Sequence, residues 1–230
     1  MKKIVFGKNS VLEAIEYEFP IEEIYLQKGL VNNNLKFKKV VYLDRNSLDK
    51  LTENGNHQGY AAKLKDFQYH DLGSIFKDGS DKVLILDHIQ DPQNFGAIIR
   101  SANVFGFKHI IIPKDRACDV TPSVLKTSSG GFKNVKVIKV NSLFDAIEEL
   151  KNKGFWIYAS ALNQQAKKLN DAKFNEKIAI IVGNEGSGVS KTLLKHSDEI
   201  IYIEQDKESV QSLNVSVATG ILLYTVFNKK

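Results

Sequence analysis

The stretch that decides the fold is residues 83–105, which read VLILDHIQDPQNFGAIIRSANVF. The apolar run at its start has the length and composition of a buried strand, and an amphipathic segment follows after a short polar turn. At 100° per residue, the apolar side chains of a helix over 95–105 share one face, and Arg100 points away from that face. The stretch therefore predicts strand, turn and helix, with Asn94 as helix cap and Arg100 directed to solvent, a ligand or another subunit.

The same alternation continues to the end of the chain. We expect strands at 83–87, 109–112, 135–138, 155–159, 178–182 and 200–203, and helices at 95–105, 121–129, 142–152, 190–195 and 213–227. The run IAIIV at 178–182 is apolar throughout, as strands buried on both faces are. The pattern predicts an α/β fold with a mostly parallel sheet and helices on both of its faces.

The beginning of the chain predicts a smaller α/β unit over residues 1–65. Its expected elements are helices over 11–16 and 48–51, the second capped by Ser47, and strands over 21–26, 39–43 and 58–64. Residues 66–81 are polar, contain two glycines and lack a long apolar repeat, so we expect a linker there. The remaining residues, 82–230, form the main predicted domain.

Composition narrows the class of protein. The chain has 230 residues, of which 43% are hydrophobic, and no apolar run reaches the roughly 18 residues of a membrane span. Its first apolar stretch is too short for a signal peptide, so we expect a cytoplasmic protein without a membrane partner. Cys118 is the single cysteine, and the five histidines lack metal-ligand spacing, so we expect neither a disulfide framework nor a bound metal. A net charge of +5 is compatible with RNA binding and equally with a solvated lysine-rich surface.

A glycine-rich loop follows the buried strand 178–182 and reads Gly183-Asn184-Glu185-Gly186-Ser187-Gly188. It matches neither a P-loop nor the dinucleotide spacing Gly-x-Gly-x-x-Gly. Its three glycines allow the backbone to approach a ligand closely, although a simple tight turn explains them as well. Glu185 can accept hydrogen bonds from amines or orient a neighbouring side chain.

The third segment, residues 212–227, reads SLNVSVATGILLYTVF. Ser212 and Asn214 open a predicted helix whose first N–H groups can bind a carboxylate or a phosphate. The helix is apolar on nearly every face, which predicts burial in the core and at a subunit interface. A purely structural buried helix is the alternative.

Taken in order, these three segments resemble the motifs of the SpoU (TrmH-like) branch of the SPOUT RNA methyltransferases. The first motif corresponds to the loop from Asn94 to Arg100, the second to 183–186 and the third to 212–218. The N-terminal part, through residues 7–15 and 57–59, resembles the ribosomal-protein-like substrate-binding domain found on many members. Within the branch, the resemblance is to bacterial enzymes that methylate a guanosine ribose of 23S rRNA.

The resemblance implies a fold, a cofactor and a set of site residues. The C-terminal part would form a deep trefoil knot, an exception to the rule that chains are unknotted. S-adenosylmethionine would be the cofactor, and a homodimer acting on RNA, most specifically 23S rRNA, would be the active form, with Arg100 contributed by the partner subunit. The implied cofactor-binding residues are Gly183, Asn184, Ile203 and Leu213. The implied catalytic residues are Arg100, Asn94, Glu185, Ser212 and Asn214.

Several alternatives remain open at this point. Residues 204–211 depart from the family pattern because they lack its proline and glycine and are one residue longer, which bears on donor affinity. That departure keeps a catalytically impaired RNA-binding relative as an alternative, and tRNA or another rRNA site are alternative substrates. Arg100 has two possible roles: a guanidinium with a reference pKa above about 12 is a poor base, whereas it binds phosphate well and stabilises developing charge.

Overall fold

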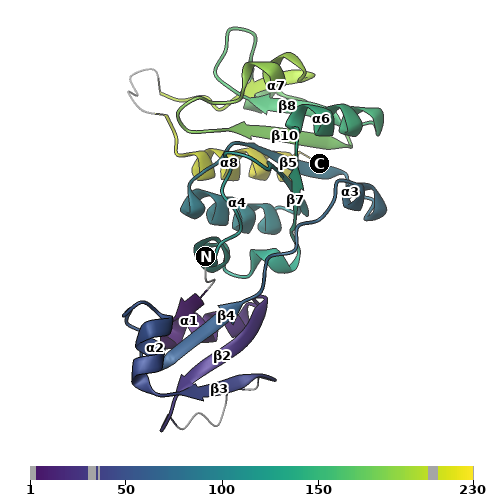
Figure 1. Ribbon diagram of the computed structural model, residues 1–230. Helices are drawn as coiled ribbons and strands as arrows, with labels where there is room; N and C mark the ends of the chain where they lie inside the picture. The colour runs from purple at the N-terminus through teal and green to yellow at the C-terminus, as the bar shows by residue number, and fades with distance from the viewer. Residues whose placement is uncertain (1–3, 31–34, 36, 207–211, 230) are drawn as a thin grey trace.

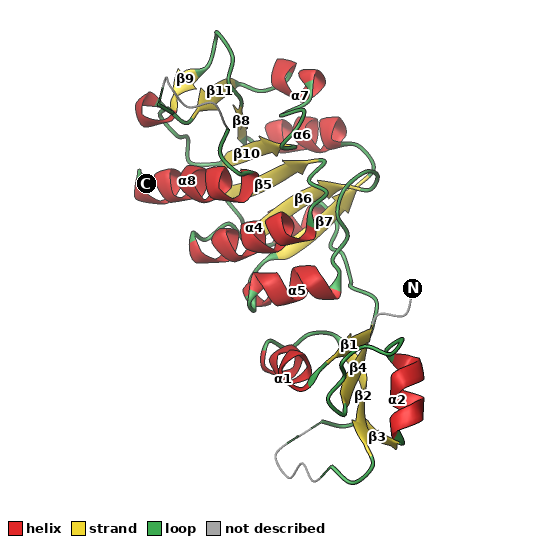
Figure 2. Cartoon of the chain, turned by 90° about the vertical axis from the view of Figure 1, so that its left-hand side faces the viewer, coloured by secondary structure: helices red, strands yellow, loops and turns green. Residues whose placement is uncertain are grey.

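The computed structural model describes residues 4–30, 35, 37–206 and 212–229, which form two sheets with their helices (Figure 1). The first part holds β1 (Ile4–Phe6), α1 (Lys8–Glu16), β2 (Ile21–Gln27), β3 (Val40–Leu43), α2 (Arg45–Leu51) and β4 (Tyr60–Leu64). Its strands are ordered β1-β4-β2-β3, and β2 and β3 are the parallel pair. Figure 2 shows α1 and α2 on opposite sides of this sheet.

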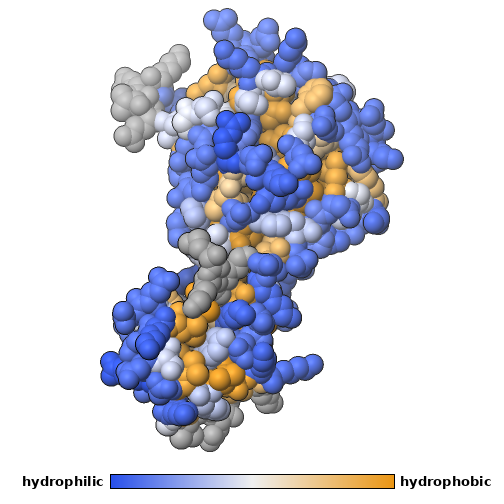
Figure 3. All heavy atoms as spheres, viewed as in Figure 1, coloured by the Kyte–Doolittle hydropathy of each residue, from blue (hydrophilic) through white to orange (hydrophobic). Residues whose placement is uncertain are grey.

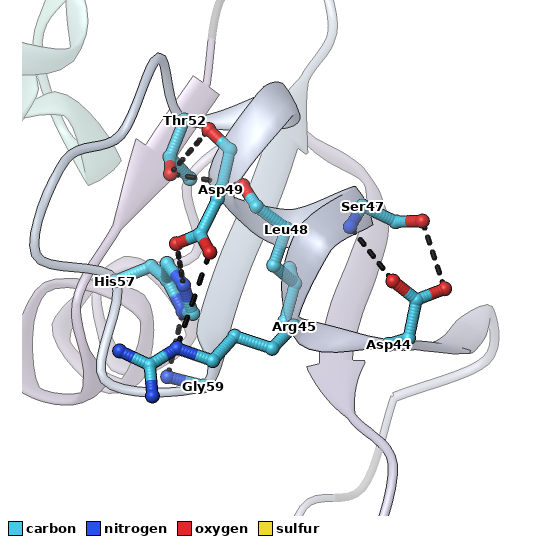
Figure 4. Close-up of polar contacts among 8 residues, drawn as sticks. All are labelled: Asp44, Arg45, Ser47, Leu48, Asp49, Thr52, His57 and Gly59. Atoms are coloured by element: carbon cyan, nitrogen blue, oxygen red, sulfur yellow. Dashed lines mark hydrogen bonds and ion pairs between the residues drawn. The ribbon is translucent and has the colours of Figure 1, made fainter.

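Helix α2 begins after Asp44, so the prediction that Ser47 caps it was wrong. The Asp44 carboxylate accepts hydrogen bonds from the Ser47 backbone N and from Ser47 Oγ, both at 2.9 Å (Figure 4). The bond from the backbone N–H has the larger effect, and together the two bonds hold the pKa of Asp44 below its ordinary value. Buried His57 then ties the chain before β4 to α2, because its Nε2 lies 2.9 Å from Asp49 Oδ1 and its Nδ1 accepts from Gly59 N.

The second part contains the larger sheet. Its elements are α3 (Gly73–Lys77), β5 (Lys82–Asp87), α4 (Pro92–Val104), β6 (His109–Pro113), α5 (Pro122–Ser128), η1 (Gly131–Lys133), β7 (Lys136–Val140), α6 (Leu143–Asn152), β8 (Trp156–Ser160), β9 (Lys167–Lys168), η2 (Leu169–Asp171), β10 (Ile178–Gly183), α7 (Lys191–Lys195), β11 (Glu199–Tyr202) and α8 (Val215–Asn228). The strand order is β7-β6-β5-β10-β8-β11-β9, and each pairing among the described residues is parallel.

Helices cover both faces of this sheet because successive strand residues point to opposite sides. In β5, Leu84 and Leu86 pack with apolar residues of α4 and α8, whereas Val83 and Ile85 pack with those of α3 and α6. Figure 2 shows α4 and α8 next to each other on one face. The predicted α/β architecture with a small N-terminal unit is therefore confirmed, and the trefoil knot stays a prediction.

The segment predicted as a linker, residues 66–81, carries a helix and is packed against the larger sheet. Its Ile75 is completely buried, and His70 N donates to Val137 O of β7 at 2.9 Å. Asp78 Oδ2 lies 2.6 Å from Lys136 Nζ and 2.9 Å from Nε2 of buried His109. Helix α3 is five residues long, too short to produce a helical repeat in the sequence. The domain limits 1–65, 66–81 and 82–230 stay a prediction.

The two parts also touch directly. Glu18, just after α1, pairs with Lys133 of η1 at 3.1 Å, and the Tyr17 ring lies against Gly130. Figure 3 shows a mainly hydrophilic face with apolar side chains gathered in patches on both parts. No helix among the described residues is long and apolar enough to cross a bilayer.

Candidate active site

Three side chains that are far apart in the sequence meet in one hydrogen-bonded network. Glu185 Oε1 accepts from Asn94 Nδ2 at 2.8 Å and from Asn214 Nδ2 at 2.9 Å. Asn214 Nδ2 also lies 3.0 Å from Asn94 Oδ1, to which it donates. The structure therefore brings together one residue from each of the three segments that the sequence singled out.

Asn94 is not the helix cap, contrary to the prediction. Asp91 is the N-cap of α4: its Oδ1 accepts from Asn94 N at 2.7 Å, and Pro92 occupies the first turn, where a missing N–H is harmless. Since Asp91 caps the helix, the side-chain oxygen of Asn94 is left to accept from Asn214 Nδ2, while its Nδ2 donates to Glu185. Arg100 is exposed on α4, as the helical phase predicted.

The loop after β10 is folded tightly back on its own strand. A Cβ on Gly183 would lie 2.1 Å from the carbonyl carbon of Gly188, so only glycine fits there. Asn184 O accepts from Gly188 N at 2.8 Å, and its side chain accepts from Gly186 N and donates to His88 O, both at 2.9 Å. These bonds present Glu185 at the loop tip.

The third segment leads into α8, and Asn214 opens this helix as predicted, whereas Ser212 lies before the cap. Asn214 Oδ1 caps the helix by accepting from Ser216 N at 2.9 Å and from Ser216 Oγ at 2.6 Å. Ser212 and Leu213 precede it and are exposed. Residues 204–211 are the stretch that departs from the family pattern, and 207–211 of it lie outside the described residues.

A cavity of about 180 Å³ opens at the carboxyl ends of β8, β10 and β11, beside this network. Its lining includes Gly183, Asn184, Ile203 and Leu213, which are the four predicted cofactor residues, together with Glu185 and Ser212 of the predicted catalytic set. Asn94 lines an adjoining hollow that shares Asn184 and Glu185 with the cavity. Arg100 lines neither space, so one chain alone does not bring it to the other predicted residues.

Sequence reasoning missed several lining residues: Ser160, Ala161, Leu162, Val182, Tyr202, Gln205, Val215 and Ala218. The signal that could have found most of them is their place at the carboxyl ends of predicted parallel strands, where ligands of α/β sheets bind. It also missed Asp87, which ends β5 and is 2% exposed. The Asp87 carboxylate accepts from Ser190 N at 2.7 Å and from His88 Nδ1 at 2.6 Å.

The site has no group of metal ligands: among the described residues, no three His, Cys, Asp or Glu side chains are placed to hold an ion. Cys118 is half-buried, and burial raises the pKa of its thiol to about 11. A thiol with that pKa is protonated at neutral pH, which makes Cys118 a poor nucleophile.

Two family models match the chain. The SpoU rRNA methylase family matches residues 81–224, and RNA 2′-O ribose methyltransferase substrate binding matches residues 4–70. A Staphylococcus aureus (strain COL) protein described as a TrmH family tRNA/rRNA methyltransferase is 35% identical over 241 residues, covering 99% of this chain and 96% of that protein. A tRNA/rRNA methyltransferase of Borreliella burgdorferi, described as uncharacterized, is 40% identical, covering 82% of this chain and 86% of its own.

Solved structures share the fold. The SpoU methyltransferase AviRb from Streptomyces viridochromogenes superposes with a TM-score of 0.75 at 20% identity, covering 99% of this chain and 89% of that chain. The A. aeolicus TrmH/SpoU tRNA modifying enzyme covers 65% of this chain and 75% of its own, with a TM-score of 0.58 and 29% identity. With both family models and near full-length relatives in agreement, the chain belongs to the SpoU/TrmH family of tRNA/rRNA methyltransferases.

Proposed function

We propose that this protein transfers the methyl group of S-adenosylmethionine to a ribose 2′-hydroxyl of RNA. The observation that carries the proposal is the meeting of Asn94, Glu185 and Asn214 beside a cavity at the carboxyl ends of the sheet. The match of residues 4–70 to a 2′-O ribose methyltransferase substrate-binding model supports the ribose as the target. Membership of the SpoU/TrmH family supports RNA as the substrate.

The cavity suits S-adenosylmethionine better than a phosphorylated cofactor. Its described lining contains no Lys, Arg or His side chain and one carboxylate, that of Glu185, so its charge favours a sulfonium cation over a phosphate. Gly183 lets the loop backbone pass close to the strand, and apolar Ile203 and Leu213 offer surface for an adenine ring. The solved structure of AviRb in complex with AdoMet supports the same cofactor.

When bound, S-adenosylmethionine supplies an electrophilic methyl group, so the chain has to align a hydroxyl and remove its proton. Glu185 holds the amides of Asn94 and Asn214 in fixed orientation, and these amides can bind the ribose and its phosphate. Ser212 stands at the cavity mouth, where it can contact donor or RNA. A guanidinium is a poor base, so we assign Arg100 the anchoring of the neighbouring phosphate and the stabilisation of developing charge, and the released proton passes to water.

The proposal includes a homodimer. Helix α8 exposes Val217 (51%), Ile221 (36%) and Tyr224 (56%), which recur at helical spacing and form one apolar stripe. Val104 on neighbouring α4 is 65% exposed. A contiguous apolar stripe of this kind is typical of an interface, and a second copy on it would bring another Arg100 close to the site.

Within RNA, we propose a guanosine of 23S rRNA as the target. The sequence resemblance supports this choice, and the small N-terminal unit offers a separate RNA-binding surface. The relatives are described as tRNA/rRNA methyltransferases, so tRNA or another rRNA site is the second candidate. A catalytically impaired RNA-binding relative is the third, because Gln205, which belongs to the stretch that departs from the family pattern, lines the cofactor cavity.

Two measurements test these proposals. Mapping of 2′-O-methyl groups on rRNA and tRNA from cells with and without this gene is expected to show one 23S guanosine that loses its methyl group. Loss of a tRNA methyl group instead would replace the rRNA proposal, and an unchanged map would contradict the enzymatic one. Calorimetric titration with S-adenosylmethionine is expected to show binding, and its absence at about millimolar donor would support the impaired relative.

A further inference from the structure

A polar hollow of about 330 Å³ adjoins the candidate active site and has no role in the function proposed above. Asn184 lines both this hollow and the cofactor cavity. Asn184 and Gln90 also line the smaller hollow to which Asn94 belongs. The hollow therefore lies next to the space that would hold an RNA ribose at Asn94. His88 and Arg116, which carry the basic groups of its lining, come from two different loops, and Asp87 adds a carboxylate.

Both of these residues have unfavourable backbone conformations. His88 has φ 61° and Arg116 has φ 52°, in the left-handed region where side chains with a Cβ are disfavoured. Strained residues of this kind cluster at functional sites, where the side chain is needed despite the strain. Two of them lining one hollow indicate a use for their side chains.

The imidazole of His88 is held in one orientation. Its Nδ1 lies 2.6 Å from Oδ1 of Asp87, and Asp87 Oδ2 accepts from Ser190 N at 2.7 Å. Since the buried carboxylate accepts both bonds, we assign a ring proton to Nδ1, and Nε2 is the ring nitrogen left to bind a ligand. His88 is 32% exposed, and among the described residues no other side chain or backbone group bonds to its ring.

Arg116 is positioned from the other side of the hollow. Gln90 Nε2 donates to the backbone carbonyl of Arg116 at 3.3 Å, which ties its loop to the stretch before α4. The side chain of Arg116 is exposed, and its guanidinium makes no ion pair with any described residue. A guanidinium free in a hollow next to an RNA site is suited to bidentate binding of a phosphate.

We propose that His88 and Arg116 form a subsite for the RNA backbone beside the target nucleotide. Arg116 binds a phosphate, and His88 Nε2 accepts a hydrogen bond from a ribose hydroxyl, a group that DNA lacks. Asp87 and Gln90 are positioning residues that act through His88 and Arg116. The inference rests on the proposed function, because it takes RNA as the substrate.

The first test compares Arg116→Ala with Lys114→Ala. Lys114 lies on the same loop and is exposed, but it does not line the hollow. Each variant therefore removes one positive charge from the same loop, and Lys114→Ala serves as the control. The probe is total RNA from cells lacking this gene, measured by filter retention and by transfer of labelled methyl groups. We expect Arg116→Ala to raise KM for RNA about tenfold and to lower the salt slope of binding by about 1, with kcat and donor affinity unchanged. Lys114→Ala is expected to change KM less than about twofold.

The second test replaces His88 by Gly, which accepts the left-handed backbone conformation without strain. We expect unchanged donor binding by calorimetry and a higher KM for RNA. A mixed-sequence oligoribonucleotide should compete better than its deoxyribose counterpart against wild type, and this preference should shrink in His88→Gly.

An equal weakening of RNA binding in Arg116→Ala and Lys114→Ala, or an unchanged KM for RNA in His88→Gly, would overturn the proposed subsite. Filter retention decides the comparison even if wild type transfers no methyl group, a result that would instead refute the proposed function.

Discussion

Replacing Gly183 by Ala tests whether the tight return of the loop after β10 shapes the cofactor cavity. The new Cβ would lie 2.1 Å from Gly188 C and from Val189 N, whereas ordinary contacts begin at 3.4 Å. The two backbone segments must therefore separate by about 1.3 Å, which costs about 1–3 kcal/mol of folding stability in a tightly packed region. A displacement of about 1 Å at a site of this kind lowers turnover about 100-fold.

Gly186→Ala is the matched control, because the nearest atom to its added Cβ is Asn184 Oδ1 at 3.5 Å, an ordinary contact. Calorimetry should show donor affinity at least about tenfold weaker in Gly183→Ala and within about twofold of wild type in Gly186→Ala. Thermal unfolding should show a lower Tm for the first variant alone. Wild-type donor affinity in Gly183→Ala, or equal losses in both variants, would refute this account of the loop.

Four further predictions concern other parts of the molecule. Arg100→Lys keeps the charge and loses the bidentate fork, so methyl transfer should fall about tenfold or more; near-full activity would exclude a role that needs the fork. Tyr224→Glu places a charge in the exposed stripe of α8 and should give a 25.8 kDa monomer by light scattering where wild type gives a dimer. Burial lowers the pKa of His109 below its ordinary 6.5, so the unfolded chain binds the extra proton and stability falls as pH drops below that value. When the pH is lowered from about 7 to about 5, the Tm of wild type should therefore fall more than that of His109→Gln. Equal falls in Tm would show that His109 does not cause this loss of stability. With its pKa raised to about 11 from 9.0, Cys118 should be alkylated about 100-fold more slowly in native than in unfolded protein, as mass spectrometry can measure, and equal rates would show that burial does not protect the thiol.

Local sequence patterns were sufficient to predict most strands and helices of the part that contains the larger sheet. The run IAIIV at 178–182 is apolar at every position because β10 is central and covered on both faces, and a strand of that kind needs no tertiary information to be found. Helix α4 was found from its 3.6-residue period. Short elements were missed, including β1, α3 and β9, because segments of two to five residues do not establish a period.

Capping shows where local reasoning failed. Asn94 and Ser47 are both good capping residues, yet Asp91 and Asp44, each three positions earlier, cap the two helices. Several residue types near a helix start can accept the same N–H groups, and the backbone conformation decides among them. At Asn94 this difference bears on the proposed site, because a side-chain oxygen that is not used for capping can accept from Asn214 Nδ2.

By itself, the sequence determined the fold class, the three segments that form the candidate site and the outward direction of Arg100, because all of these depend on local periodicity and residue type. The tertiary structure alone decided that Asn94, Glu185 and Asn214 share hydrogen bonds, and that His88 and Arg116 line one hollow. These contacts depend on which strands become neighbours in the sheet. Burial of apolar area over the whole domain sets that order, and no local stretch of sequence records it.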